Sequence, residues 1–476
     1  MTALTAQLVD FTCAPPPVAG DDALGEAATA AIVDSIGVVL AGAGSEVSDA
    51  LHRYVGTVAP AAAQEPSDWT GFQAGLAPDL TALVTGTLGH ALDFDDALPG
   101  AGHPSVILLS AATSLPVGQL PGSLLLDAFA VGFEVNARVA KAVGHKHYLH
   151  GWHTTATVCC FGAAAAAARV LRLSPVQVAR TYGIVASLAA GLQRNFGTFT
   201  KPLHSGFAAR AGVMAALMAE AGMTADESIL DGDRGFLAVY AQGAQQGDAV
   251  ADLGRRWSLV QPGTTQKKYP CALETYRAVD GLLELQARHG IAAADIAGIS
   301  AVLPPGTLGP LRYPRPRDEM QAKFSMPYAL AAAALDGTLS NSSFTPAAIA
   351  RPEAARLMTC VQLSEDVANR PEDPSGRNSS ASFGGFVDVA VTTAAGIVST
   401  RVHHPAGSPQ RPLSAADRTA KFLDCAAFGG RDADVASDVL PQLSRLSEVP
   451  DVHDILNRLT PTHVLDHCAQ EGSPRS

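Results

Sequence analysis

The chain has 476 residues, of which 47% are hydrophobic, and a formal net charge of −12 at pH 7. This length and apolar content allow a large buried core, in two or three domains or in one large helical domain with an insertion. Nucleic acid is excluded as the expected partner, because phosphate binding requires a concentrated basic face and the sequence contains none.

The seven cysteines are scattered and include no C-x-x-C pair. This pattern favours buried free thiols in a reducing compartment over a disulfide framework or a structural zinc site. The first residues lack a basic region followed by an apolar core, and the Ala-rich run 162–168 is too short to span a bilayer. We therefore expect a cytoplasmic protein with no membrane partner.

Helical spacing of apolar residues dominates the first half of the chain. It runs through residues 23–41, and Pro78 opens a further helix that ends in an acidic cluster. Ser174, followed by proline, is an N-cap with Pro at the first helical position. The runs 154–171 and 208–221 are rich in Ala and Gly, which let helices approach closely, so we expect them inside a helical bundle.

The second half mixes strand and helix patterns. Residues 299–303 form a short apolar run, and 386–393 alternate before 397–402 resume, which is a hairpin pattern. Two helices are predicted between these strands, over 326–335 and 346–357.

The predicted fold class is mainly α, with a large all-helical domain and a smaller α+β domain. We assign residues 1–264 to the helical domain, 265–402 to the α+β domain and 403–476 to a segment that returns to the helical domain. In that last segment, Ser414 caps a helix over 415–428. A polar stretch, 369–382, is expected to be an exposed loop.

Chemically active side chains concentrate where an apolar helix ends. Three carboxylates and two histidines lie in the segment 89–105. Charge in such a place is expensive to bury and usually has a solvent, ligand or catalytic use. A second stretch adds Lys201 and His204, in what the flanking Gly197 and Gly206 suggest is a loop. Together the two stretches indicate an enzyme that acts on small acids.

Each of these residues also has an ordinary structural explanation. Asp93 can simply contact solvent at the end of a helix, and Asp95 and Asp96 can cap a later element. His153 precedes a helix, where a neutral imidazole is either an acid/base or simply packed against backbone. Lys201 can clamp a carboxylate, although most lysines lie at the surface.

A metal site is not expected. The histidines at 145, 147, 150 and 153 lack the i, i+4 spacing of a helical zinc site and a clear carboxylate partner. Glycine pairs such as Gly86 with Gly89 indicate helix packing, since no phosphate-loop motif is present.

Six segments taken in this order resemble the MmgE/PrpD family, which includes 2-methylcitrate dehydratase, cis-aconitate decarboxylase and iminodisuccinate epimerase. They are GHALDFDD with HPS (89–105), GWHTTAT (151–157), NFGTFTKPLHSG (195–206), KKYPC (267–271), AKFSMPYALAAAALDG (322–337) and PLSAADRTAKFLDCA (412–426). The resemblance implies a helical domain with an α+β lid, an active site in the cleft between them and usually a homodimer. It also implies small di- and tricarboxylate substrates, with no metal or organic cofactor.

The resemblance also implies roles for individual residues. Those that would arrange protonation are His153, Lys201 and Asp93. Those that would hold or support the substrate are His103, Lys267, Tyr328 and His204.

Four positions depart from the family pattern, and each loses a polar group. Ala97 stands where the acidic motif often continues with threonine, and Ala272 where cis-aconitate decarboxylases have histidine. Tyr276 replaces a common histidine, and Phe207 a common arginine or other polar residue. These changes suggest a substrate with fewer carboxylates or a larger apolar portion than methylcitrate.

The leading interpretation is a hydro-lyase that dehydrates a β-hydroxy acid, 2-methylcitrate-like or alkyl-substituted. A cis-aconitate-type decarboxylase or a dicarboxylate epimerase is the alternative within the family, and Ala272 weakens the decarboxylase interpretation. From another class, a catalytically degenerate acid-binding protein stays open, although Asp93, His103, His153 and Lys201 argue against it.

Overall fold

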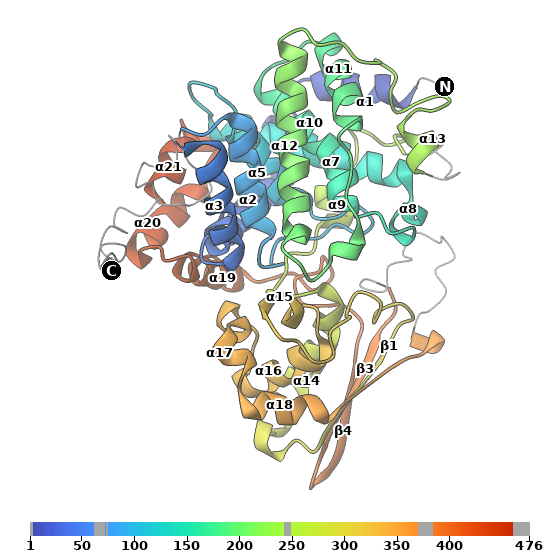
Figure 1. Ribbon diagram of the computed structural model, residues 1–476, viewed down its shortest axis with the longest axis vertical. Helices are drawn as coiled ribbons and strands as arrows, with labels where there is room; N and C mark the ends of the chain where they lie inside the picture. The colour runs from blue at the N-terminus through green and yellow to red at the C-terminus, as the bar shows by residue number, and fades with distance from the viewer. Residues whose placement is uncertain (1–2, 61–71, 73–74, 242–248, 370–383, 460–476) are drawn as a thin grey trace, which may run out of the picture.

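The computed structural model describes residues 3–60, 72, 75–241, 249–369 and 384–459 (Figure 1). Helices predominate in these residues and accompany one four-stranded sheet, so the mainly α class is confirmed. The predicted exposed loop 369–382 lies, apart from Asn369, outside the described residues.

Most helices gather in one body, the upper part of Figure 1. We call it the helical part and define it as the described residues from 3 to 264 together with 415–459. Its first helices are α1 (Leu4–Cys13), α2 (Asp22–Gly42), α3 (Glu46–Val58), α5 (Pro78–His90), α6 (Pro104–Thr113), α7 (Gly122–Val143) and α8 (His145–Leu149). They are followed by α9 (Thr154–Thr157), α10 (Cys159–Val170), α11 (Pro175–Ala186), α12 (Thr200–Glu220) and α13 (Phe236–Tyr240). The C-terminal segment adds α19 (Ala415–Phe428), α20 (Ala433–Leu443) and α21 (Val452–Arg458).

Within the helical part, α2 packs against α5 and against α19 from the C-terminal segment. By length and composition α2 is the one helix in the described residues that could cross a membrane. Most of it is nevertheless buried within the protein. The bounds of α19 are those predicted from sequence, and its Ser414 cap pairs with Asp417 in a capping box.

Glycines allow α5 and α12 to approach closely. A Cβ at Gly206 would lie 2.1 Å from Thr87 Oγ1 and 2.3 Å from the Leu83 carbonyl oxygen. A Cβ at Gly86 would lie 3.0 Å from the Cα of Gly206. The predicted packing role of Gly86 is confirmed, but Gly206 belongs to this contact inside α12 and not to a loop. The close approach brings the end of α5 next to the start of α12.

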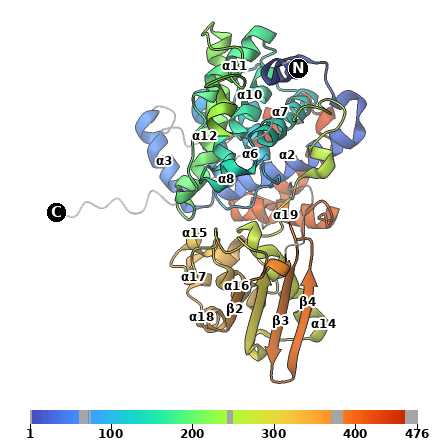
Figure 2. The ribbon, with the colours of Figure 1, turned by 90° about the vertical axis from the view of Figure 1, so that its right-hand side faces the viewer.

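Residues 265–369 and 384–402 form the sheet part, below the helical part in Figures 1 and 2, and residues 403–414 connect it to α19. Its elements are β1 (Gly298–Leu303), β2 (Val361–Glu365), β3 (Val387–Thr393), β4 (Gly396–Val402), α14 (Tyr276–His289), α15 (Glu319–Ala322), α16 (Met326–Asp336), α17 (Pro346–Ile349) and α18 (Pro352–Thr359). The strand order is β2-β1-β3-β4, and only β1 and β2 are parallel. Helix α14 packs against β3 and β4, and α16 packs against α14 and α18.

Two sequence predictions for the sheet part need correction. The helix expected over 346–357 is two short helices, because Arg351 precedes a proline and takes an extended conformation (φ −59°, ψ 126°). Strand β2 was not predicted; its side chains are half-exposed or exposed, so it lacks the apolar alternation of a strand. The hairpin of β3 and β4 is confirmed.

Candidate active site

A cavity of about 110 Å³ lies where the helical part meets the sheet part. Its polar and charged lining residues are Asp93, His103, His145, Tyr148, His153, Thr154, Thr155, Lys201, Lys267 and Glu274. The other lining residues are Ala97, Leu98, Gly100, Gly102, Phe196, Ala272, Leu273, Pro310 and Phe324. The cavity therefore combines a charged region that contains two lysines with an apolar wall.

Asp93 stands at the centre of the charged region. Helix α5 ends at His90, and Asp93 takes a left-handed conformation (φ 51°) in the loop that follows. Aspartate tolerates this region better than most residues. The turn places its carboxylate against Lys201 and its carbonyl oxygen against Lys267.

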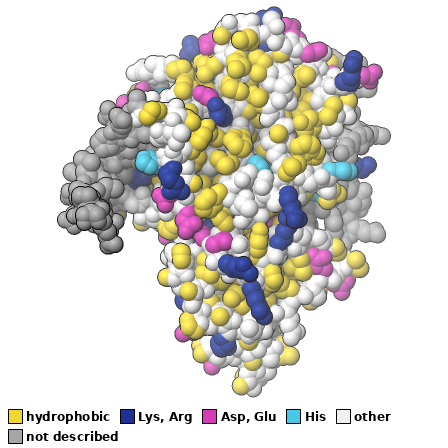
Figure 3. Space-filling model, viewed as in Figure 1, with side chains coloured by type: hydrophobic (Ala, Val, Ile, Leu, Met, Phe, Trp, Pro, Cys, Tyr) yellow, Lys and Arg dark blue, Asp and Glu magenta, His cyan; other side chains and the backbone are white. Residues whose placement is uncertain are grey.

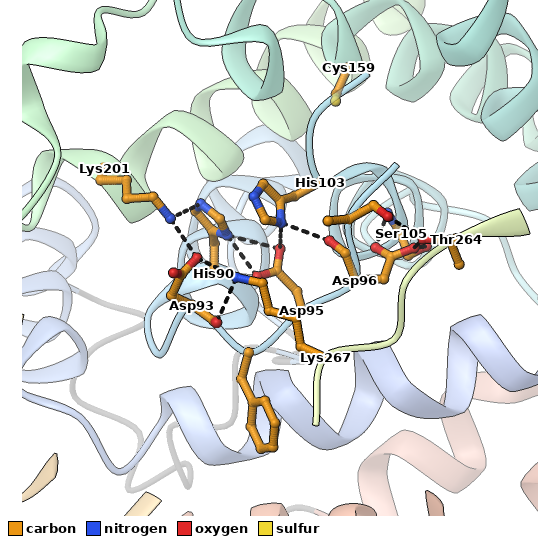
Figure 4. Close-up of polar contacts among 12 residues, drawn as sticks. His90, Asp93, Asp95, Asp96, His103, Ser105, Cys159, Lys201, Thr264 and Lys267 are labelled. Carbon is orange, nitrogen blue, oxygen red and sulfur yellow. Dashed lines mark hydrogen bonds and ion pairs between the residues drawn. The ribbon is translucent and has the colours of Figure 1, made fainter. Parts of the chain in front are cut away.

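Two buried lysines share the Asp93 carboxylate (Figure 4). The Nζ atoms of Lys201 and Lys267 lie 2.7 and 2.8 Å from Asp93 Oδ1. Burial raises the pKa of Asp93, but the two lysines outweigh that effect and hold the pKa well below its usual value. Asp93 thus holds two ammonium groups close together beside the cavity, where they can also donate to an anionic ligand. Lys201 lies in the first turn of α12, which corrects its predicted place in a loop.

His90 links Lys201 to a second carboxylate. Lys201 Nζ lies 3.0 Å from His90 Nε2, and His90 Nδ1 lies 2.8 Å from Asp95. Because an ammonium group only donates, Nε2 is the acceptor and Nδ1 carries the proton that is donated to Asp95. Burial, and then the charge of Lys201, hold the pKa of His90 well below its usual value, so the ring is neutral. Asp95 thus fixes the tautomer of the imidazole that faces Lys201.

Asp96 connects the acidic loop to α6. It accepts hydrogen bonds from Ser105 Oγ and Thr264 Oγ1, both at 2.6 Å, and from the Ser105 backbone N–H at 3.3 Å. The last bond caps the first turn of α6, as predicted for a carboxylate in this cluster. Burial raises the pKa of Asp96 from 3.8 to about 6, although both hydroxyl hydrogen bonds lower it.

We expect Asp96→Asn to change how stability depends on pH. Because the pKa of Asp96 is higher in the folded protein, its contribution to stability is complete below about pH 4 and is lost as the pH rises through about 6. The free energy of unfolding of the wild type should therefore fall by about 3 kcal/mol relative to that of Asp96→Asn across this pH range. Denaturant unfolding at pH 4, 5, 6 and 7 measures the difference. An Asp49→Asn variant, at an exposed position, is the control, and a difference that stays constant with pH would contradict the expectation.

The site histidines are neutral. Burial lowers the pKa of His103 to about 3 and that of His204 to about 4, and it holds the pKa of His153 well below its usual value. His153 Nδ1 and His204 Nδ1 share a hydrogen bond of 2.9 Å. His103 Nδ1 lies 2.7 Å from the Asp96 carbonyl oxygen, to which it donates, so its Nε2 is unprotonated. These rings act as neutral hydrogen-bonding groups around the lysines.

The structure brings most of the predicted site residues together. Those that line the cavity are Asp93, His103, His153, Lys201 and Lys267. His204 is not among the lining residues and supports His153 from behind. The predicted place of Tyr328 in the site needs correction. Tyr328 lies in the core of the sheet part and donates a 2.6 Å hydrogen bond to the Ser343 carbonyl oxygen. Its position in the first turns of α16 points it inward, away from the cavity.

The four departures from the family pattern fall in different places. Ala97 and Ala272 line the cavity, where they extend its apolar wall beside Phe324. Tyr276 is buried in the sheet part, and its hydroxyl donates to the Tyr269 carbonyl oxygen. Phe207 is 43% exposed on α12 and does not line the cavity. The expectation that Phe207 makes the surroundings of the substrate more apolar therefore needs correction.

One group of described residues offers three potential metal ligands close together, His90, Asp95 and His103. Both ring Nδ1 atoms donate hydrogen bonds, to Asp95 and to the Asp96 carbonyl oxygen, and His90 Nε2 accepts one from Lys201. In this structure the three residues belong to the hydrogen-bond network around Lys201. The histidines at 145, 147, 150 and 153 do not form such a group.

Sequence reasoning missed several residues of the site. His90 and Asp95 belong to the motif that was singled out, yet only their contacts reveal that His90 links Lys201 to Asp95. The ring centroids of Phe196 and Phe324 lie 5.7 and 5.3 Å from Lys201 Nζ. Neither phenylalanine has a neighbouring sequence signal that marks it as a site residue.

Comparisons with known proteins agree with the architecture of the chain. Models of the MmgE/PrpD N-terminal and C-terminal domains match residues 6–248 and 269–440. The chain is similar to cis-aconitate decarboxylase of Mus musculus, with 31% identity over 353 residues and 71% of each chain covered. It is also similar to cis-aconitate decarboxylase of Homo sapiens, with 31% identity over 307 residues, which cover 62% of this chain and 63% of the relative. For the cis-aconitate decarboxylase of Aspergillus terreus, identity is 28% over 240 residues with 46% and 48% covered.

Proposed function

Because the chain belongs to the MmgE/PrpD family, we propose that it is a lyase that decarboxylates a small polycarboxylic acid of the cis-aconitate type. The named relatives support the decarboxylase alternative better than dehydration, which was the leading interpretation of the sequence. We propose that the acid binds in the cavity between the helical part and the sheet part, and that no cofactor takes part.

The observation that carries this proposal is the pair of lysines around Asp93. Lys201 and Lys267 are 3% and 1% exposed, and a buried ammonium group attracts an anion far more strongly than an exposed one. Two of the three N–H groups of Lys201 bond to Asp93 and His90 in the structure, which leaves one for the substrate.

In the proposed reaction the bond between carbon and the departing carboxylate breaks, and CO₂ leaves. The electron pair of that bond moves into the conjugated system of the remaining acid, where negative charge develops on a carboxylate next to the reacting carbon. Lys201 and Lys267 would stabilise this charge. Such electrostatic stabilisation of the transition state is the largest single contribution to the rate enhancement of many enzymes. A proton must then be delivered to carbon, and burial lowers the pKa of Lys201 as a proton donor requires.

The neutral histidines suit the same step. His153 and His103 line the cavity without adding charge, so they would orient the acid by hydrogen bonds. The loss of histidine at Ala272 removes one polar group from the expected decarboxylase pattern, which makes the identity of the acid the first question to settle.

The test is an NMR screen of the purified protein in D₂O. The panel contains cis-aconitate, 2-methylcitrate, citrate and alkyl-substituted maleates and malates. We expect one unsaturated acid to lose CO₂ and to gain one deuterium at carbon, with an inactive Lys201→Ala protein as the control. Loss of water from 2-methylcitrate at a metabolic rate, without decarboxylation, would instead establish the dehydratase. Silence across the panel would favour an acid-binding protein.

Dimerisation stays a prediction of the family resemblance. Phe207 and Met218 of α12 are 43% and 37% exposed. Figure 3 shows many hydrophobic side chains on the face of the helical part that carries α12. An exposed apolar face of this kind supports the proposal that two copies associate there.

A further inference from the structure

Thr155 carries a buried hydroxyl that has no hydrogen-bond partner. Its side chain is fully buried, and Thr155 is the one cavity-lining residue among the described residues whose buried polar atom lacks a partner. Thr157, two residues further on, is satisfied by His147 and by the His153 carbonyl oxygen. Burying a hydroxyl without a partner is costly, so such a group in a cavity calls for an explanation.

Gly102 packs directly against this hydroxyl. Gly102 lines the cavity in a left-handed conformation (φ 82°), and a Cβ there would lie 2.8 Å from Thr155 Oγ1. The Oγ1 atom thus lies against Gly102 at the cavity wall, where any larger residue would clash with Thr155. A helical threonine has two populated χ1 rotamers, so rotation can turn the hydroxyl toward a bound ligand.

The chemistry around Thr155 favours an oxygen ligand that accepts hydrogen bonds. Lys201 and Lys267 bring two ammonium groups to one side of the cavity, and His103, next to Gly102, is neutral. A hydroxyl beside such a region can donate one more hydrogen bond to an oxygen of a bound anion. Since Lys201 and Lys267 both surround Asp93, a second carboxylate of the same acid would need a donor elsewhere in the cavity.

We infer that Thr155 binds a substrate carboxylate, by donating its hydroxyl proton to an oxygen of the second carboxylate of a di- or tricarboxylic acid. The inference rests on the proposed function for the class of the substrate. It adds a residue that distinguishes acids with two carboxylates from acids with one.

The test is calorimetric binding of tricarballylate, the saturated analogue of aconitate, to wild type, Thr155→Val and Thr155→Ser. Valine has the shape of threonine without the hydroxyl, and serine keeps the hydroxyl. We expect Thr155→Val to weaken binding about tenfold or more, as for a hydrogen bond to a charged group, and Thr155→Ser to bind nearly as wild type. The melting temperature of Thr155→Val should not fall, because no protein partner loses its bond.

Thr265→Val is the matched control. Its hydroxyl is also buried and unpartnered, but Thr265 does not line the cavity, so binding should not change. Equal affinity of wild type and Thr155→Val, or equal weakening by Thr155→Ser, would overturn the inference. So would failure of wild type to bind tricarballylate. Binding that depends on Thr155 without turnover of any acid would refute the proposed reaction and leave this inference standing.

Discussion

Lys201→Ala is expected to reduce kcat/KM about a thousandfold or more, which is the upper range for the loss of a single charge-stabilising donor. Lys201 joins Asp93 to His90 and presents its remaining N–H to the cavity. Removing it takes away both the nearby positive charge and the proposed proton donor. The fold should survive, because Lys267 still pairs with the same oxygen of Asp93. Steady-state kinetics together with a melting curve measure both effects.

Lys201→Arg separates the two proposed tasks of this side chain. Arginine keeps the charge but does not deprotonate in proteins, so we expect binding to recover in part while kcat stays low. Lys146→Ala, at an exposed position on α8, is the control and should behave as wild type. Near-normal turnover by Lys201→Ala would show that the proposed site is wrong.

Lys421→Met is expected to cause the largest loss of stability, about 3 to 5 kcal/mol, as for a broken buried ion pair. Lys421 comes from α19 and pairs with Asp34 of α2 at 2.8 Å. Its ammonium group also donates to the carbonyl oxygens of Phe94 and Lys267, at 2.9 and 2.8 Å. Burial already raises the pKa of Asp34 in the presence of this lysine, so the carboxylate would be left without its main partner. Denaturant unfolding measures the loss.

The double variant Asp34→Asn/Lys421→Met tests the cause. If the cost comes from an unpaired buried carboxylate, removing that charge as well should recover part of the stability. Arg288→Ala, which breaks an exposed pair with Glu284, is the control and should change little. A Lys421→Met protein as stable as wild type would contradict the expectation.

The sequence predicts the helices best where their ends carry local signals. Ser174, before a proline, and Ser414, before Asp417, both form capping boxes in the structure. Their signals depend on neighbours along the chain, so tertiary contacts are not needed to recognise them. Strand β2 carries no such signal, because only its pairing with β1 makes it a strand.

The candidate site was predicted as a set of residues but not as a geometry. Lys201 was singled out correctly as a cavity residue, while its closeness to the end of α5 reflects the tight contact that Gly206 makes with that helix. Tyr328 shows the opposite error, because a tyrosine in a family motif can serve the core. Nothing local in the sequence distinguishes a hydroxyl that faces a cavity from one that satisfies a backbone carbonyl.

The return of α19 to α2 has a consequence for how this protein is made. During translation, α2 emerges from the ribosome long before α19, which covers one of its faces. At about 5 to 20 residues per second, that face waits roughly 20 to 80 s for its cover. A nascent chain interrupted between the two helices would present an unfinished apolar surface to chaperones and proteases. Early termination should therefore yield a degraded product, and not a partly active enzyme.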